Sequence, residues 1–383
     1  MDFEIPYEIK ELQKELRRFI KDEIKPLQDK HMDENGTVPE AIRKQVRKRS
    51  RELEFYGIDF PESVGGGGLD ILGMSILREE IGKSGVILAQ AVFGEFGALQ
   101  SILLECNDQQ KEKYLTPSLN ADKLSCFALT EPNAGSDAAS METTAVKDGD
   151  QYILNGTKHY ISNAPYADFA IVFAVTDPAA RTGNRISCFL VDKGTPGFTN
   201  GRVQKNMADA DRVGELFFND CQVPAENLLG EEGKGFKLAM GRVGQGRIRL
   251  SSEFLGSADL CLRLSIDHAK SRVQFGKPIG QNQFIQQMLV EMAVGIHSCR
   301  MMLYHAAWKA SQGKDVSQET SMLKLATSEI WSKSADYAVQ IHGGMGVMQE
   351  SLVASMYQMS RVARIGEGTS EVQKMLLAKH LLK

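Results

Sequence analysis

The sequence lacks the features that mark zinc proteins, disulfide-stabilised proteins and membrane proteins. Its six cysteines are scattered without a C-x-x-C pair, and its seven histidines do not cluster with acids at ligand spacing. We therefore expect no metal site, no disulfide framework and mostly buried, reduced thiols. No apolar run approaches the roughly 20 residues that a membrane-spanning helix needs. The N-terminus opens with the acidic run M-D-F-E rather than a signal peptide, so a cytoplasmic protein without a membrane span is expected.

An excess of basic charge is also missing. The chain has 45 Lys and Arg residues against 49 Asp and Glu residues, and its formal net charge is -4. The densest basic run, residues 43–51, has helical spacing, and we expect it to form the solvated face of a helix. Nucleic acid is therefore not an expected partner.

The patterns that are present change twice along the chain. A length of 383 residues predicts two to three domains. Helical spacing begins at Ile9, is expected to stop at Pro26, and resumes in segments up to about residue 124. A glycine-rich loop at residues 60–69 interrupts these segments, and we interpret it as a connector. Helical patterns return after residue 232 and favour antiparallel helices in a bundle.

Between residues 125 and 232 the pattern is one of short β-rich runs separated by turn residues. These runs are residues 152–155, 169–175, 186–191 and 215–219. Because no helix lies between them, a parallel sheet is not expected. The predicted fold is mostly α with a central β domain: a helical domain at 1–124, a β domain at 125–232 and a helical domain at 233–383.

One carboxylate near the C-terminus has an unusual setting. Glu367 lies between Gly366 and Gly368 in the stretch R-V-A-R-I-G-E-G-T-S-E-V-Q. Glycine on both sides permits a sharp turn and the close approach of a flat ligand. An acid on such a turn can remove a proton next to a carbonyl. Taken alone, however, the stretch is more typical of a solvated loop before a helix.

Four further segments offer groups for a polar, planar or anionic ligand. The loop F-A-L-T-E-P-N-A-G-S-D at 127–137 supplies backbone N–H groups and hydroxyls, and Y-I-S at 160–162 supplies an aromatic ring, after what we expect to be a β-hairpin. The run R-V-Q-F-G-K at 272–277 supplies a cation. The run Q-I-H-G-G-M-G at 340–346 can bring backbone N–H groups against a pyrophosphate, although it can also simply end a helix. Each segment alone is weak evidence.

Together these segments resemble the acyl-CoA dehydrogenase family over essentially the whole chain. The motifs T-E-P-x-A-G-S-D, N-G-x-K-x-x-I-[ST]-N, R-x-Q-F-G-x-x-[IL], Q-x-x-G-G-x-G and E-G-T occur in family order and at family spacing. The resemblance implies a helical N-terminal domain, a β-barrel-like middle domain and a C-terminal four-helix bundle. It also implies FAD between the last two domains, and a homotetramer built as a dimer of dimers.

The resemblance also assigns roles to residues by position. Thr130, Tyr160 and Ser162 match groups beside the flavin ring, and Tyr160 stands where the family often has Trp. The complete expected FAD set is Phe127, Leu129, Thr130, Gly135, Ser136, Tyr160, Ile161, Ser162, Arg272, Gln274, Phe275, Gln283, Gln340, Gly343, Gly344, Thr369 and Glu371. Of these, Arg272, Gln274, Phe275 and Gln283 match residues that reach the FAD of the neighbouring subunit. The expected substrate contacts are Ser136, Gly246, Arg247, Glu367 and Gly368.

The same comparison identifies the expected base. Some relatives carry it at the position of Gly246, which has no side chain here, so Glu367 is the family-compatible base. The implied reaction converts an acyl-CoA to a trans-2-enoyl-CoA: Glu367 removes the α-proton, and a hydride passes from the β-carbon to flavin N5. The thioester carbonyl would be polarised by the Glu367 N–H and a flavin ribityl hydroxyl, in the manner of an oxyanion hole.

Departures from the family pattern bear on the acyl group. Gly366 stands where medium-chain members place an aromatic residue, so either the pocket is wider, favouring branched, cyclic or aromatic acyl groups, or neighbouring side chains fill the space. Leu88 stands near the position of an Arg in glutaryl-specific members, which disfavours a dicarboxylic substrate. Glu95 could face the acyl pocket, although a solvated or N–H-bonded Glu is the more frequent case.

Several functions fit this resemblance. The first is an acyl-CoA dehydrogenase that passes electrons to an electron-transfer flavoprotein, and the second is an enoyl-CoA reductase that uses the same site in reverse. An oxidase is less compatible, because oxidases of this family are usually longer. A non-catalytic, flavin-bearing protein that protects nucleic acid would carry a basic C-terminal extension, whereas this chain ends soon after the E-G-T turn.

Overall fold

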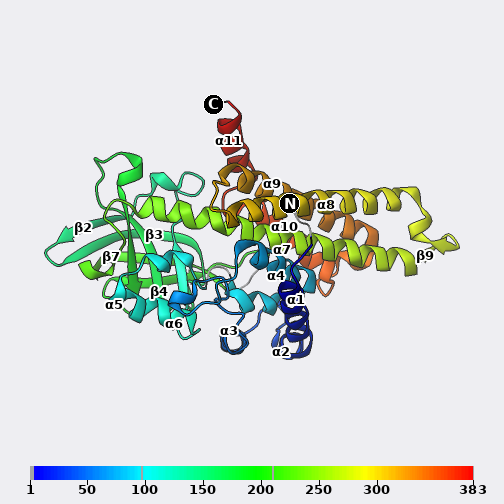
Figure 1. The fold of residues 1–383 in the computed structure, drawn as a ribbon, viewed down its shortest axis with the longest axis horizontal. Coiled ribbons are helices and arrows are strands. Elements are labelled where there is room, and N and C mark those ends of the chain that lie inside the picture. Colours follow the sequence, from blue (N-terminus) through cyan, green and yellow to red (C-terminus); the bar gives the residue numbers. More distant parts are fainter. Residues whose placement is uncertain (1–3, 96–97, 209–210, 383) are drawn as a thin grey trace. The chain divides into compact units, whose positions relative to one another are not determined.

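The structure, a computed structural model, describes residues 4–95, 98–208 and 211–382. The chain divides into two compact units. The first, which we call the helical unit, comprises Met1–Gln28, Leu69–Ala89 and Gly244–Lys383, and the second, the sheet unit, comprises Asp29–Gly68 and Gln90–Val243. The predicted fold class is confirmed: helices occupy the N- and C-terminal parts of the sequence, and an eight-stranded sheet lies between them in sequence (Figure 1).

The sheet is largely antiparallel, as expected for strands without intervening helices. Its strands are β1 (Ser125–Ala128), β2 (Thr144–Asp148), β3 (Gln151–Ser162), β4 (Phe169–Val175), β5 (Ile186–Asp192), β6 (Phe198–Val203), β7 (Val213–Pro224) and β8 (Leu228–Leu229). Their order is β6-β7-β3-β2-β4-β5-β8, and β1 pairs with β4. The β1–β4 and β2–β4 pairings are parallel. All four predicted β-rich runs lie in strands.

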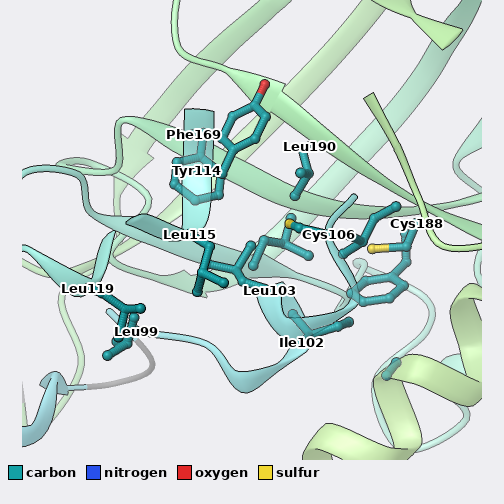
Figure 2. Close-up of a cluster of buried hydrophobic side chains, with 14 of the residues drawn as sticks. Leu99, Ile102, Leu103, Cys106, Tyr114, Leu115, Leu119, Phe169, Cys188 and Leu190 are labelled. Atoms are coloured by element: carbon teal, nitrogen blue, oxygen red, sulfur yellow. The ribbon is translucent and has the colours of Figure 1, made fainter. Parts of the chain in front are cut away.

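One of the two core clusters of the sheet unit lies where short helices meet the sheet. Every residue of β4 is buried, which is the pattern of a strand covered on both faces. Figure 2 shows the cluster around Phe169 and Leu190, with Leu103 and Leu115 from helical segments packed against it. The Tyr114 ring lies 4.8 Å from that of Phe169. Its hydroxyl donates to Asp192 at 2.8 Å, so the one polar atom of this buried ring is satisfied. The helical segments of this unit include α3 (Glu40–Glu52), η2 (Glu62–Val64), η5 (Ser101–Glu105), α5 (Asp108–Gln110), η6 (Lys111–Leu115), α6 (Thr116–Leu119), η7 (Ala138–Ser140), η8 (Thr182–Asn184) and η9 (Ala225–Asn227).

The helical unit is built from long helices that enclose a second core. Its helices are α1 (Tyr7–Phe19), η1 (Ile20–Ile24), α4 (Ile71–Ser84), α8 (Gln283–Ser311), α9 (Ser317–His342), η11 (Gly343–Val347), α10 (Leu352–Ala363) and α11 (Ser370–Leu381), together with most of α7 (Gly235–Ser271). Buried apolar residues of α7, α8, α9 and α10 form one cluster that includes Leu255, Leu303 and Trp331. Helices α4 and α7 cross closely at Gly82 and Gly256, where an added Cβ would lie 2.2 and 2.1 Å from the partner backbone.

The first predicted helix continues past Pro26 instead of ending there. Residues Ile20–Ile24 form a π-helical turn, and α2 (Lys25–His31) follows without a break. The π turn shifts the register by one residue, with the Lys25 N–H bonded to the Ile20 carbonyl. A single π turn is a recognised way to absorb a residue that cannot join the regular ladder. The prediction of a helix end at Pro26 was therefore wrong.

The basic run of α3 is not a solvated face throughout. Arg43 and Arg47 are each 3% exposed. Arg47 pairs with Glu40 and, at 2.8 Å, with Glu95. Glu95 is itself buried and accepts from the Arg47 guanidinium, so of the two expected alternatives it is N–H-bonded and not solvated. The cysteine prediction is confirmed, since all six are free and buried. Within the described chain, no helix is both long and apolar enough to span a bilayer.

Candidate active site

The turn that carries Glu367 joins α10 to α11 in the helical unit. Glu367 has φ +55° and Gly368 has φ +89°, so two consecutive residues adopt the left-handed conformation. Glycine accepts this at little cost, whereas at Glu367 it is an uncommon and strained state. Thr369 then caps α11, its hydroxyl accepting from the Val372 N–H at 3.2 Å. The glycine-flanked turn inferred from the sequence is thus present, and Glu367 occupies its left-handed corner.

Side chains from three helices hold both carbonyls of this turn. Arg247 of α7 donates through Nε to the Glu367 carbonyl at 3.2 Å. Lys324 of α9 donates to the Gly368 carbonyl at 2.7 Å. Gln373 of α11 donates to both carbonyls, at 3.3 and 3.0 Å. The side chains of Lys324 and Gln373 are fully buried, so the backbone of the turn is fixed from inside the unit.

The charges around the turn are mostly removed from water. Glu367 is partly buried, and its Oε2 atom is buried. Burial lowers the pKa of the Arg247 guanidinium, and the negative charge of Glu367 opposes that change. Burial also lowers the pKa of Lys324, to about 8, with Arg247 acting in the same direction. The carboxyl group of Glu367 therefore interacts electrostatically with two cations, Arg247 and Lys324, in a poorly hydrated environment.

In the sheet unit, the loop after β1 is tied to β3 by a buried ion pair. Lys158 and Glu131 are both buried, with Nζ and Oε1 2.7 Å apart. Glu131 also accepts from the N–H groups of Glu142 and Thr143, at 2.6 and 3.0 Å. The Thr130 carbonyl accepts from the His159 N–H at 2.9 Å. The loop that the resemblance places along the flavin is thus anchored on its buried side, through Glu131 and the Thr130 carbonyl.

Other residues of this loop are accessible to solvent. Gly135 and Ser136 are exposed, whereas Phe127, Leu129 and Thr130 are partly buried. The Phe127 ring lies 4.9 Å from that of Phe173. The loop therefore presents small and hydroxyl-bearing residues at the surface while its buried residues hold it in place. Such a surface is suited to contact with a polar, planar ligand.

The sequence suggested that Tyr160 follows a β-hairpin, but Tyr160 lies within β3. It has φ +56° and falls at a register irregularity between Lys158 and Ile161. A β-bulge of this kind re-aims a side chain, and the Tyr160 ring is 63% exposed. Its N–H donates to the Gln204 side chain at 3.1 Å, and its ring lies 4.0 Å from that of His159. Ile161 is buried and Ser162 partly buried, so the aromatic ring is the most exposed of the three.

Two segments assigned to the FAD pyrophosphate and to the neighbouring subunit lie side by side in the helical unit. The imidazoles of His268 and His342 stack with centroids 4.4 Å apart. Arg272 follows His268 by one helical turn, and its charge contributes to a lowered His268 pKa, after burial and His342. Gly343 follows His342 directly. The stacked pair therefore joins the Arg272 end of α7 to the Gly343 end of α9.

The residues of these two segments are open to solvent. Gly343 and Gly344 are exposed, and an added Cβ on either would meet no atom of the described residues within 4 Å. Gly343 has φ +62° and ψ -137°, a conformation that is essentially restricted to glycine. Gln340 and Gln283, the first residue of α8, are also exposed. Phe275 is 99% exposed at the tip of the hairpin formed by β9 (Val273–Gln274) and β10 (Lys277–Pro278).

The structure thus gathers the predicted residues into three groups, each within one unit. Glu367, Gly368, Thr369 and Glu371 lie with Arg247 at the α10–α11 turn, and Gly246 precedes Arg247 on α7. The residues from 272 to 283 and from 340 to 344 lie at the other ends of α7 and α9. The residues from 127 to 136 and from 160 to 162 belong to the sheet unit.

Three supporting residues were missed by the sequence analysis: Lys158, Lys324 and Gln373. Lys158 stands inside the quoted N-G-x-K motif, and its motif position was the available signal. Lys324 breaks an otherwise apolar or small-residue stripe of α9, beside Leu323, Thr327 and Ser328. A lysine there requires a buried partner, but the sequence does not say which acceptor it meets.

Comparisons with known proteins cover the whole chain. Family models for the N-terminal, middle and C-terminal domains of acyl-CoA dehydrogenases match residues 6–122, 126–221 and 233–382. The chain is 39% identical over 385 residues to the short-chain specific acyl-CoA dehydrogenase of Rattus norvegicus, covering 99% of this chain and 91% of the relative. It is 37% identical over 386 residues to the acryloyl-CoA reductase (NADH) of Anaerotignum propionicum, covering 100% and 96%. The solved butyryl-CoA dehydrogenase of Megasphaera elsdenii superposes over 100% of both chains with a TM-score of 0.91 and 35% identity.

Proposed function

The chain belongs to the acyl-CoA dehydrogenase family of oxidoreductases, and we propose that it carries out FAD-dependent α,β-dehydrogenation of an acyl-CoA thioester. The product is the trans-2-enoyl-CoA, and Glu367 is the general base. One observation carries this proposal. Glu367 occupies a left-handed corner, and the carbonyls of Glu367 and Gly368 are held by Arg247 and by the buried side chains of Lys324 and Gln373. A solvated loop acid would have no need of such support.

The residues fit FAD as the cofactor. The exposed Tyr160 ring offers a face for stacking, and the loop from Phe127 to Ser136 offers N–H groups and hydroxyls. The open backbone at Gly343 and Gly344 and the nearby Arg272 suit a pyrophosphate. Thr369 and Glu371 complete the proposed set beside the adenosine half. When bound, FAD supplies the acceptor for the hydride that leaves the substrate β-carbon.

The chain's own residues carry the proton chemistry. The Glu367 carboxylate takes the α-proton, and the Glu367 N–H donates to the thioester carbonyl oxygen, on which negative charge develops. A fixed donor at such an oxygen contributes roughly 3–4 kcal/mol to the transition state. The turn is braced before substrate arrives, so little reorganisation is needed at the moment of reaction. Ser136 and Gly246 are proposed to contact the CoA moiety. Arg247 is also proposed to contact the CoA moiety, and its hydrogen bond to the Glu367 carbonyl helps to hold the turn.

The acyl group is proposed to be short in its main chain and to tolerate a branch or ring near the reacting carbons. Two relatives are named for short or butyryl substrates. At Gly366 an added Cβ would meet, among the described residues, only the Val362 carbonyl, at 4.0 Å, so the helical unit leaves room beside the proposed base. We propose an electron-transfer flavoprotein as the acceptor of the electrons.

Reverse operation as an enoyl-CoA reductase is the second candidate, favoured by the 37% identity to an acryloyl-CoA reductase. The same base and donors would serve, because a catalyst accelerates both directions of one step. The six buried, unpaired thiols fit a reducing, cytoplasmic compartment. A homotetramer is proposed as the assembly, since Phe275 and Phe284 are 99% and 79% exposed, and exposed aromatic residues of this kind mark protein interfaces.

The test is anaerobic bleaching of the bound flavin by straight, branched, cyclic and aromatic acyl-CoA thioesters. We expect Glu367→Gln to retain yellow FAD and to bleach slower by roughly 3 orders of magnitude or more, because nothing replaces the base. The exposed Glu350→Gln serves as the control and should bleach at the wild-type rate. A near-normal rate in Glu367→Gln would reject the assignment, and a colourless protein that refuses FAD would reject the function.

A further inference from the structure

Lys324 is a buried cation that the proposed reaction does not yet use. It lies on α9 with a fully buried side chain, and its ammonium donates to the Gly368 carbonyl at 2.7 Å. The charged groups that act on it come from each neighbouring element: Arg247 of α7, Glu367 of the turn, Glu329 of α9 and Glu371 of α11. Glu329 is itself engaged by Arg364 at 3.0 Å and by the Ser370 hydroxyl at 2.7 Å.

The hydrogen bond alone does not explain a lysine at this position. Gln373 already donates to the same Gly368 carbonyl at 3.0 Å, so this buried acceptor is satisfied without Lys324. Taking an ammonium out of water costs several kcal/mol, and a second cation, Arg247, increases the cost here. What Lys324 adds over a neutral donor is positive charge, placed at the Gly368 carbonyl, one residue after Glu367.

We propose that Lys324 is a positioning residue of the dehydrogenation, whose positive charge holds the Gly368–Thr369 peptide through the Gly368 carbonyl and stabilises the negative charge that develops on the thioester at that turn. The inference rests on the proposed function, because it takes Glu367 as the base. It adds a regulatory consequence. When Lys324 loses its proton, the hydrogen bond can persist but the charge is gone, so the reaction slows at alkaline pH.

The first test compares the pH dependence of kcat/KM between pH 6 and 10 in the wild type and two variants. Lys324→Gln retains a donor without charge, whereas Lys324→Met removes both. Since burial lowers the Lys324 pKa to about 8, wild-type kcat/KM should fall about tenfold from pH 7 to 9.5. Both variants should be about tenfold slower at pH 7 and should lack this alkaline limb.

Lys333→Met is the matched control. Lys333 lies on the same helix, but its side chain is 46% exposed and pairs with Glu291 at 2.6 Å. We expect it to keep the wild-type pH profile. A Lys324→Gln profile that matches the wild type in rate and shape would overturn the charge-based role. Loss of rate in Lys324→Met alone would do the same, because it would assign the effect to the hydrogen bond.

The second test does not depend on activity or on bound FAD. A buried lysine with a pKa near 8, against 10.5 when unfolded, binds fewer protons in the folded state between these two values. The unfolding free energy of the wild type should therefore rise with pH in this window relative to Lys324→Gln. We expect the Tm of the wild type to rise relative to that of Lys324→Gln as the pH increases from 8 to 10. Parallel Tm curves would contradict a buried, titrating Lys324.

Flavin bleaching in Glu367→Gln and the pH profile of Lys324→Gln together separate this inference from the proposed function. If Glu367→Gln bleaches the flavin normally, the base assignment fails, whatever Lys324 does. If Glu367→Gln is inactive while Lys324→Gln keeps the wild-type pH profile, Glu367 stands as the base and only the role of Lys324 is rejected.

Discussion

Nζ of Lys158 lies 2.7 Å from Oε1 of Glu131 in the interior of the sheet unit, with both side chains withdrawn from water. The pair links the middle of β3 to the loop that is proposed to line the flavin. Lys158 also donates to the Leu129 carbonyl at 3.3 Å. The position of this loop therefore depends on a charge pair that cannot be replaced by solvent.

Lys158→Met should be strongly destabilising. It leaves the Glu131 carboxylate buried without its cation, and breaking a buried pair in this way costs about 3–5 kcal/mol. Guanidinium unfolding should show the loss, and FAD affinity should fall with it because the loop loses its anchor. The double variant Lys158→Met/Glu131→Gln should recover part of the stability. Lys111→Met, which breaks an exposed pair with Asp108, should change the unfolding free energy by less than about 1 kcal/mol.

Glu95 should contribute stability that is lost in acid. Burial acts to raise its pKa, but the charges of Arg47, Arg212 and Arg43 outweigh burial and hold the pKa below the usual 4.5. A depressed carboxyl pKa gives stability that is fully present above 4.5 and is lost as the pH falls through the folded-state value. Glu95→Gln should therefore lower the Tm at pH 7, and the difference from wild type should shrink below pH 4.5.

The control for this prediction is Glu52→Gln on α3. Glu52 is exposed and pairs with Arg49 at 2.9 Å, so its removal should change the unfolding free energy by at most about 1 kcal/mol. An unchanged Tm for Glu95→Gln at pH 7 would show that the buried arginines do not need this carboxylate.

Phe275 should matter to assembly and not to the folding of a single chain. It has φ +51° next to Gly276 at φ +76°, the two central positions of a tight hairpin that favours Asn-Gly. Phe275→Asn should relieve strain of about 1 kcal/mol and leave or slightly raise the stability of the subunit. If the exposed ring meets a neighbouring subunit, the variant should dissociate more readily and release FAD faster. Sedimentation velocity and flavin fluorescence measure these effects, and wild-type values in both would contradict the prediction.

The sequence predicted the turn at Glu367 but not the side chains that support it, for a physical reason. Glycines on both sides of Glu367 permit a sharp turn, whereas the proposal that Glu367 is the base comes from the family resemblance. Lys324 and Gln373 lie 43 residues before and 6 residues after Glu367, and they meet it only when α9 and α11 are packed. Contacts between helices depend on crossing geometry, which periodicity does not specify.

Two other predictions from the sequence were wrong for a related reason. The expected helix end at Pro26 followed a rule about missing N–H groups, and one π turn removed the conflict. The buried arginines of α3 looked solvated because charge runs usually are. The burial of Arg47 depends on Glu40 of the same helix and on Glu95, which lies 48 residues after Arg47. The local pattern specified the helix, while a distant acid decided which of its faces is buried.

Gly366 offers a direct test of acyl selectivity. Its backbone φ is not positive, and within the part of the chain that the structure describes an added Cβ would meet only the Val362 carbonyl at 4.0 Å, so Gly366→Tyr should fold without backbone strain. The new ring should occupy space beside Glu367 and exclude branched, cyclic and aromatic acyl groups. Gly368→Ala is the contrasting variant, because φ +89° and a Cβ 2.7 Å from the Gln373 amide should disturb the turn itself. In Gly366→Tyr we expect kcat/KM for bulky thioesters to fall at least about tenfold, which is about 1.4 kcal/mol, while that for butyryl-CoA changes by less than about threefold. In Gly368→Ala every substrate should be affected alike. Equal losses for butyryl-CoA and bulky thioesters in Gly366→Tyr would show that Gly366 does not set the width of the pocket.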